Sequence, residues 1–566
     1  MLKEIYPSHL KMISFEGAKE WIPFFGSNSQ ALKELSANMV QLKDTDAFFG
    51  WYEKNQLLFI VGVTFYKDEV HVNNLLKMSK TVRNKAYYNG LVAIAKRRFF
   101  KKIVLKLAKQ PLLKAQELHK LGFSYQDGNG YELGLSYNTG LVLGGGGAKG
   151  AYQIGVWHCL EELSINYTMM SGTSVGALNG GLILQGELEV AEEMWQSIAT
   201  EKILSLPFDA SDEYTIKELI NKLQLLTKTA VQSKGVSTGP LLNLIKELMD
   251  PEKIFNREKD FFIVTTETPR MEEKVVSLKE MTEETLPRWL LASSSFFPAM
   301  AACQIDGIYY VDGGYRNNVP RDVLLNRGAT ELLVIDVNGP GITKPYRLEN
   351  GVTELIFNSS WGLGNVLLFD GKRSTWNMRL GYLEAKKLLG DYSGQVYTFP
   401  NKNFKKECLI LSREFLHFLK KIPRFGSWYK RKTTLKEWEW LQKNQIVPEF
   451  VSLILLESLA KKLMIDPTLL YSLDELSQLV VKKFHEKEEL VGDDLNQTMM
   501  HSLGEWLTKY AQQKSPISEF QQIASYYHYF EDEAESHRDS YDLLLDVSWK
   551  IGLEALFLMF LEKRNK

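Results

Sequence analysis

The chain has 566 residues, a formal net charge of −1, and 45% hydrophobic and 24% charged residues. This length exceeds what one hydrophobic core usually serves and predicts two to four domains. A near-neutral charge lacks the strongly basic footprint of a nucleic-acid-binding protein, so no nucleic-acid partner is expected.

The three cysteines, Cys159, Cys303 and Cys408, are far apart and odd in number. They predict neither a disulfide framework nor a zinc site, and they indicate a reducing compartment. Residues 1–30 lack a long apolar run, and nowhere do 18 uncharged apolar residues follow one another, so neither a signal peptide nor a spanning helix is predicted. We expect a cytoplasmic protein without metal or cofactor that touches membranes only peripherally, on the inner face.

The first 137 residues form one predicted α+β domain. Its elements are strands at 48–52, 57–66 and 70–76, a helix at 87–99, a strand at 103–107, a helix at 113–121 and a strand at 131–135. This order resembles the acetyl-CoA-dependent N-acetyltransferase superfamily. That family's loop, Gln/Arg-x-x-Gly-x-Gly/Ala, aligns with Arg83–Tyr88, where Ala86 and Tyr88 replace the small residues that admit a pyrophosphate. The resemblance therefore implies a degenerate domain that does not acetylate; an unrelated α+β domain is the alternative.

Basic residues gather in the same domain, mainly between Lys80 and Lys102. Such a cluster either docks anionic lipid headgroups or forms a solvated helix face, and the solvated face is the favoured interpretation.

A glycine loop opens the next segment. The apolar run Thr139–Leu143 predicts a strand that leads into four glycines, and helical spacing begins after Lys149. Backbone N–H groups at a strand-to-helix junction bind a phosphate or stabilise an oxyanion. A dinucleotide site is excluded because no acidic residue follows at the required spacing, and a P-loop is excluded because Lys149 precedes Gly150.

The second motif is Gly172-Thr173-Ser174-Val175-Gly176, between a predicted strand at 167–170 and a helix. This is G-x-S-x-G in the strand-turn-helix setting of a nucleophile elbow. Ser174 is therefore the candidate nucleophile; the alternative is a serine that caps the following helix.

The third motif is an apolar strand, Ile308–Val311, that delivers Asp312 into a Gly-Gly turn. Together the three motifs resemble the patatin-like phospholipase family in its bacterial form, over residues 138–395. That family pairs a G-G-G-x-R/K-G loop with a G-x-S-x-G elbow and a D-G-A/G turn. The matching motif positions are Gly145, Gly146, Gly147, Lys149, Gly150, Gly172, Gly176, Gly313 and Gly314.

The resemblance implies a Ser-Asp dyad. Asp312 is the base that takes the proton of Ser174, and the N–H groups of Gly145, Gly146 and Gly147 form the oxyanion hole. The histidines after Asp312 all lie in the C-terminal segment, and we interpret them as ordinary helix residues. Lys149 either steers an anionic headgroup or lies at the surface.

Strands at 261–265 and 332–337 and a helix at 290–295 predict a parallel-rich sheet within a three-layer α/β core. A helical insertion at about 187–249 is expected to cover an acyl pocket or simply to pack on the core. Residues 396–566 are predicted to be mainly helical. Within them, Phe415–Trp440 mixes aromatic and basic residues, which suits either a lipid interface or a packed helical pair.

The sequence therefore predicts a serine lipid acyl hydrolase that cleaves carboxylic ester bonds of phospholipids or acylglycerols. A lipid transacylase is one alternative, because an acyl-enzyme serves both reactions. A catalytically silent lipid-binding scaffold is the other.

Overall fold

The computed structural model describes residues 2–5, 47–53, 56–77, 84–105, 114–127, 130–203, 238–297, 299–349, 351–422, 450–498, 518–531 and 548–565. They form two compact units, residues 1–3 with 49–390 and residues 4–48 with 391–566. Several predicted features lie outside the described residues: Lys80 and Arg83, the insertion between 204 and 237, and residues 423–449 of the aromatic and basic segment. The two predicted domain boundaries, after residues 137 and 395, stay predictions.

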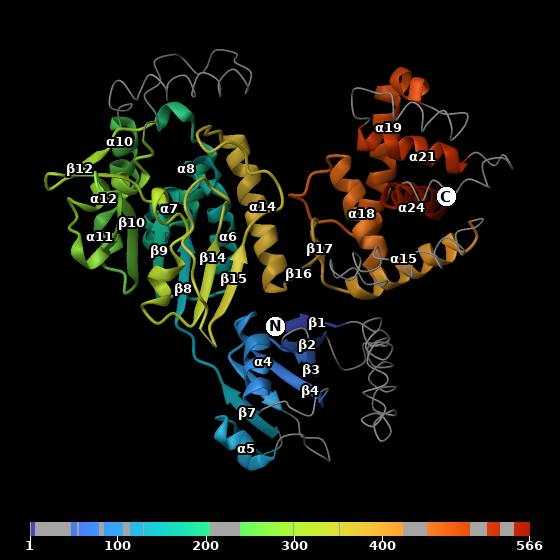
Figure 1. Cartoon of the computed structure of the whole chain (residues 1–566), viewed down its shortest axis with the longest axis horizontal. Coiled ribbons are helices and arrows are strands. Elements are labelled where there is room, and N and C mark those ends of the chain that lie inside the picture. The colour runs from blue at the N-terminus through green and yellow to red at the C-terminus, as the bar shows by residue number, and fades with distance from the viewer. Residues whose placement is uncertain are drawn as a thin grey trace. The chain divides into compact units, whose positions relative to one another are not determined.

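The first unit begins with a seven-stranded sheet in the order β1-β2-β3-β4-β5-β7-β6 (Figure 1). The pairing of β4 with β5 is parallel, whereas β3–β4, β5–β7 and β6–β7 are antiparallel. The elements are β1 (Leu2–Glu4), β2 (Ala47–Glu53), β3 (Gln56–Phe65), β4 (Glu69–Lys77), α4 (Asn84–Lys96), β5 (Lys102–Leu105), α5 (Ala115–Lys120), β6 (Ser124–Gln126) and β7 (Gly130–Gly134). The predicted order of strands and helices is confirmed; β1 and β6, of three residues each, were too short for a sequence pattern to reveal.

A second sheet follows in the order β12-β13-β10-β9-β8-β14-β15, with β11 also paired to β10. Five of its strands, β8, β9, β10, β14 and β15, are parallel to their neighbours in this set. The strands are β8 (Thr139–Leu143), β9 (Met169–Thr173), β10 (Asp260–Thr268), β11 (Glu272–Ser277), β12 (Cys303–Ile305), β13 (Ile308–Asp312), β14 (Glu331–Ile335) and β15 (Thr353–Phe357).

Helices cover both faces of this sheet. Successive side chains of β8 point to opposite faces of the sheet, and both faces are covered. Leu141 and Leu143 belong to one buried cluster, and Val142 belongs to another. The first cluster includes residues of α6 (Ala151–Glu162), α7 (Val175–Gln185), α12 (Leu286–Ser294) and α14 (Gly371–Leu389). The second includes residues of α13 (Arg321–Leu325). The predicted three-layer α/β core is confirmed.

The predicted insertion is helical at both of its described ends. It contains α8 (Leu188–Gln196) and α10 (Gly239–Leu248). Apolar residues of both helices, including Ala191, Trp195, Leu241 and Ile245, are buried in the same cluster as α7.

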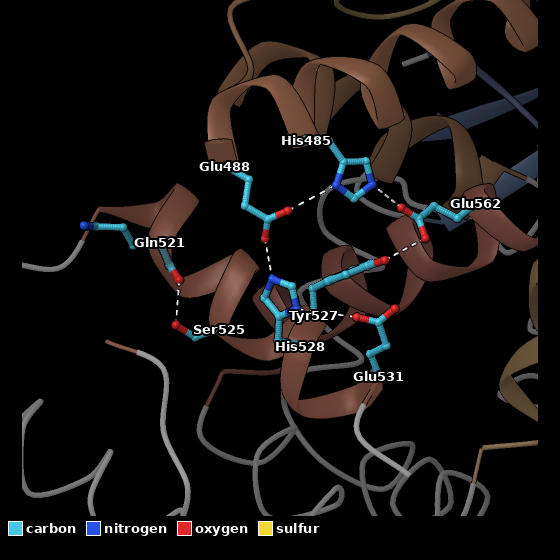
Figure 2. Close-up of polar contacts among 8 residues, drawn as sticks. All are labelled: His485, Glu488, Gln521, Ser525, Tyr527, His528, Glu531 and Glu562. Carbon is cyan, nitrogen blue, oxygen red and sulfur yellow. Dashed lines mark hydrogen bonds and ion pairs between the residues drawn. The ribbon is translucent and has the colours of Figure 1, made fainter. Parts of the chain in front are cut away.

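The second unit contains the predicted helical C-terminal region. Its main helices are α15 (Phe404–Leu419), α18 (Val451–Lys462), α19 (Leu473–Thr498), α21 (Glu519–Glu531) and α24 (Trp549–Asn565). Figure 2 shows that α19, α21 and α24 are joined by a network of histidine and glutamate side chains. Over the residues that the structure describes, no helix combines the length and the hydropathy that crossing a membrane requires.

Candidate active site

The register of β10 brings Ser174 and Asp312 together. Strand β11 occupies one edge of β10, pairing with residues 262–267, so β9 and β13 share the other edge. There they meet end to end, because Thr173 pairs with Val264 and Asp312 pairs with Thr265, the next residue along. Ser174 follows Thr173 directly, and its hydroxyl interacts with the Asp312 carboxylate in a way that favours the ionised carboxylate. The sheet itself thus joins two motifs that are 138 residues apart.

Ser174 lies in the tight turn that a nucleophile elbow requires. Its φ of 56° and ψ of −127° are an uncommon conformation for a residue with a side chain. The flanking glycines permit the turn, because a Cβ on Gly172 would lie 2.5 Å from the Gly176 carbonyl oxygen. A Cβ on Gly176 would lie 2.2 Å from the carbonyl oxygen of Leu143. The turn leaves Ser174 half-buried at the N-terminus of α7.

Asp312 is almost fully buried, with 4% of its surface exposed. Burial raises the pKa of its carboxyl to about 6, although hydrogen bonds from Ser174 and from the Gly314 N–H favour the ionised form. The Gly314 N–H donates to Asp312 Oδ1 at 2.7 Å. A carboxylate with a raised pKa is a stronger base, so this environment suits Asp312 to accept a proton near neutral pH.

The glycine loop offers two backbone donors rather than three. The Gly145 N–H donates to the carbonyl oxygen of Asn318 at 2.9 Å, which removes it from the expected oxyanion hole. Within the described part of the chain, no hydrogen bond engages the N–H groups of Gly146 and Gly147, and both residues line the same cavity as Ser174. Gly147 has a φ of 55°, and a Cβ there would lie 2.0 Å from the carbonyl oxygen of Val366. Only glycine fits this position.

Lys149 does not line the cavity. Its Nζ donates to the carbonyl oxygen of Asn338 at 2.8 Å. Burial lowers the pKa of Lys149, and the nearby charge of Asp336 acts in the opposite direction. This hydrogen bond links the turn before α6 to the segment that follows β14.

A mainly apolar cavity lies against Ser174 and Asp312. It encloses about 930 Å³ of empty space, counting its open mouth, and Ser174 and Asp312 are among its lining residues. Its apolar wall comes from α7, α8 and the turn after it, α10 and the segment before α14: Leu178, Leu182, Met194, Ile198, Leu241, Leu244, Ile245, Val366, Leu367 and Phe369. An apolar lining of this kind suits the hydrocarbon chain of a lipid.

Two side chains of the site carried no sequence signal. Ser293 Oγ accepts the N–H of Ser174 at 2.9 Å and donates to the carbonyl oxygen of Val264 at 2.6 Å. Asn318 Nδ2 contacts the carbonyl oxygens of Gly145 and Gly339, each at 3.3 Å. Ser293 lies 119 residues from Ser174, and Asn318 lies 173 residues from Gly145.

Of the histidines that follow Asp312, His417, His485 and His528 are described, and all three belong to the second compact unit. No group of three or more metal-ligating side chains that could hold a metal ion occurs among the residues whose structure is described.

The segment that contains Ser174 and Asp312 is similar to segments of known proteins. Residues 141–325 match the family model described as patatin-like phospholipase. The chain is 32% identical over 213 residues to patatin-like phospholipase domain-containing protein ZK370.4 of Caenorhabditis elegans. The aligned region covers 37% of this chain and 14% of that protein. It is 31% identical over 203 residues to neuropathy target esterase sws of Drosophila melanogaster, covering 35% of this chain and 13% of that protein.

Human patatin-like phospholipase domain-containing protein 6 is 29% identical over 208 residues, covering 36% of this chain and 14% of that protein. The match thus spans about one seventh of each relative's length. Among solved structures, VipD from Legionella pneumophila aligns over 78% of this chain and 92% of that chain, with 14% identity and a TM-score of 0.30. Residues 141–325, which hold all three motifs, therefore form a patatin-like phospholipase domain.

Proposed function

We propose that this chain is a serine lipid acyl hydrolase that cleaves carboxylic ester bonds of phospholipids or acylglycerols. The observation that supports the proposal is that the register of β10 brings the Ser174 turn next to the buried Asp312, and that both residues line one mainly apolar cavity. The matched relatives support it, since their names describe phospholipase domains and an esterase.

In the acylation step, Ser174 Oγ attacks the ester carbonyl carbon while its proton passes to the Asp312 carboxylate. The carbonyl oxygen becomes an oxyanion that accepts hydrogen bonds from the N–H groups of Gly146 and Gly147. When the intermediate collapses, the ester bond breaks, Asp312 returns the proton to the leaving alkoxide, and the acyl group stays on Ser174. The acyl chain occupies the apolar cavity.

In the deacylation step, Asp312 takes a proton from water, and the resulting hydroxide attacks the acyl-Ser174 carbonyl. The intermediate collapses to a free fatty acid, and Asp312 returns its proton to Ser174. A lipid hydroxyl in place of water gives the transacylase, which uses the same residues. The catalytically silent scaffold is disfavoured because both dyad residues and the cavity are present together.

The substrates of the proposed hydrolase lie in membranes, so we infer peripheral contact with the inner membrane face and a cytoplasmic location, in a protein of the bacterial type. The N-terminal domain is proposed as a degenerate N-acetyltransferase fold. What supports this is the agreement of its element order with the resemblance, and the placement of Ala86 and Tyr88 within α4 rather than in a glycine loop.

The test is fatty-acid release from a panel of phospholipids and diacylglycerols by the wild type and by Ser174→Ala. We expect release by the wild type and a loss of at least about 1,000-fold in the variant, because the nucleophile is gone. Ser197→Ala, at an exposed serine of the same domain, serves as the control and should keep the wild-type rate. Adding a lysolipid acceptor separates the transacylase, which would form a diacyl product. Equal release by wild type and Ser174→Ala would refute the proposal.

A further inference from the structure

The end of α12 touches both members of the dyad. Ser293 Oγ accepts the backbone N–H of Ser174, and the Ser295 carbonyl oxygen accepts the backbone N–H of Asp312, each at 2.9 Å. Ser293 and Ser295 are fully buried. One short segment, 119 residues beyond the nucleophile, therefore contacts the two catalytic backbones.

Ser293 differs from the serines that follow it. The hydroxyls of Ser294 and Ser295 donate back to carbonyl oxygens four residues earlier in their own helix, at Leu290 and Leu291. This is the usual hydrogen bond of a serine within a helix. The Ser293 hydroxyl instead donates to Val264 of β10 at 2.6 Å, which leaves its lone pair aimed at the Ser174 N–H.

Both contacts of Ser293 fall at the point where β9 and β13 meet. Val264 is the β10 residue that pairs with Thr173, and its neighbour Thr265 pairs with Asp312. The Ser293 hydroxyl thus links Ser174 to strand β10, whose residue Thr265 pairs with Asp312. The Ser174 backbone adopts an uncommon φ of 56°, a conformation that persists only where its surroundings hold it.

We propose that Ser293 is a positioning residue of the acyl hydrolase: its hydroxyl fixes the Ser174 backbone so that the Ser174 hydroxyl meets Asp312. The inference rests on the proposed function. Loss of the Ser293 hydroxyl leaves the N–H of the half-buried Ser174 without its acceptor and frees the elbow to shift. The hydrogen bond from Ser174 to Asp312, which favours the carboxylate, then weakens.

The test compares Ser293→Ala with Ser171→Ala in the full-length chain. Ser171 is the matched control, because it is also fully buried in this domain and donates one hydrogen bond to a carbonyl oxygen, that of Pro320, at 2.9 Å. We expect Ser293→Ala to lower kcat about 10-fold to 100-fold while KM changes little, since misplacement of a reacting group affects the transition state rather than the acyl pocket. Ser171→Ala should keep the wild-type kcat.

A second readout separates positioning from general loosening. Weakening of the Ser174–Asp312 hydrogen bond raises the pKa of Asp312, so the acid limb of kcat should move to higher pH in Ser293→Ala and stay in place in Ser171→Ala. Ser293→Cys, with a side chain of similar size but only a weak sulfur acceptor, should behave like Ser293→Ala and decides the matter where the alanine variant does not fold.

Wild-type kcat and an unmoved acid limb in the Ser293 variants would overturn the inference. A loss no greater than that of Ser171→Ala would do the same. Ser174→Ala in the same assay keeps the two claims apart. If Ser174→Ala is inactive while the Ser293 variants are normal, only the positioning role fails; if Ser174→Ala remains active, the proposed function fails as well.

Discussion

At the scale of single residues, the proposed role of Asp312 as the base makes the pH dependence of the reaction follow from the burial of its carboxyl. Burial raises its pKa from the ordinary 3.8 to about 6, and the base works only when it is ionised. We predict that kcat/KM falls tenfold per pH unit once the pH is well below about 6, measured from pH 4.5 to 8.5 with a soluble ester. A rate that stays level down to pH 4.5 would contradict this account of the base.

The same pKa shift has a consequence for stability. Because the folded state holds the Asp312 proton more tightly than the unfolded state, its contribution to stability is largest below pH 3.8 and is lost as the pH rises through about 6. Asp312→Asn removes this buried charge and can still accept the Gly314 N–H. At neutral pH it should abolish turnover while leaving the melting temperature no lower than that of the wild type.

Some residues of the candidate site can be predicted from the sequence, and others cannot. Ser174, Asp312 and the glycines stand in short motifs whose spacing reflects backbone geometry, so their pattern is visible locally. Ser293 and Asn318 act through hydrogen bonds that span 119 and 173 residues, and no local pattern marks them. Gly145 was expected to donate to the oxyanion, but its N–H is engaged by the carbonyl of Asn318, which only the folded chain reveals.

At the scale of elements, helix α10 contributes one wall of the apolar cavity. Leu244 is half-buried and lines it, whereas its neighbour Asn243 is exposed and does not. We predict that Leu244→Trp shortens the space for the acyl chain and lowers kcat/KM for long-chain esters relative to butyrate esters on the order of 10-fold. Asn243→Trp is the matched control and should keep the wild-type preference. An unchanged chain-length profile in Leu244→Trp would exclude the cavity as the acyl site.

The C-terminal helices carry a charged clamp, defined as His485, Glu488, His528, Glu531 and Glu562 (Figure 2). Each imidazole contacts a carboxylate through both ring nitrogens: His485 with Glu488 and Glu562, and His528 with Glu488 and Glu531. A neutral imidazole has only one N–H, so only the charged form satisfies both contacts. Tyr527 also donates to Glu562 at 2.6 Å.

The clamp predicts a pH-dependent stability. Burial lowers the pKa of His485, but its hydrogen bonds to Glu562 and Glu488 outweigh burial, and the hydrogen bond to Glu488 raises the pKa of His528. Their contribution is therefore complete below pH 6.5 and is lost as the pH rises through the raised values. Burial opposes the ionisation of Glu488, yet its histidine contacts keep its pKa lowered, so its contribution is complete above pH 4.5.

We expect the C-terminal unfolding transition to occur at a higher temperature at pH 5.5 than at pH 8. The double variant His485→Gln with His528→Gln should reduce this difference, as measured by calorimetry on the full chain. An equal pH dependence in the double variant would show that other groups cause it. The sequence placed these histidines correctly in helices but gave no sign of their partners, which lie on other helices.

At the scale of the first compact unit, one buried ion pair joins its two sheets. Lys96 at the end of α4 contacts Glu331 at the start of β14, and the exposed fractions of these side chains are 11% and 2%. Glu331 also accepts the backbone N–H of Asn138 at 3.1 Å. This link spans 235 residues, so the sequence could predict each sheet from its local pattern but not their connection.

We predict that Lys96→Met destabilises this unit by about 3–5 kcal/mol, because it leaves the Glu331 carboxylate buried without its counter-charge. Adding Glu331→Gln should recover much of the loss, since the amide is neutral and its oxygen can still accept the Asn138 N–H. Chemical denaturation of the full chain measures both. If Lys96→Met unfolds at the wild-type denaturant concentration, the pair does not hold the unit together.

The most direct test of the Ser-Asp acyl hydrolase is labelling with a fluorophosphonate ester, followed by mass spectrometry of the modified peptide. The probe phosphonylates a serine whose proton a neighbouring base accepts, so it reports the dyad without requiring the natural lipid. We expect one adduct, on Ser174, that is absent in Ser174→Ala and forms far more slowly in Asp312→Asn. A folded wild-type protein that stays unlabelled in the presence of anionic vesicles, or that is labelled at another serine, would contradict it.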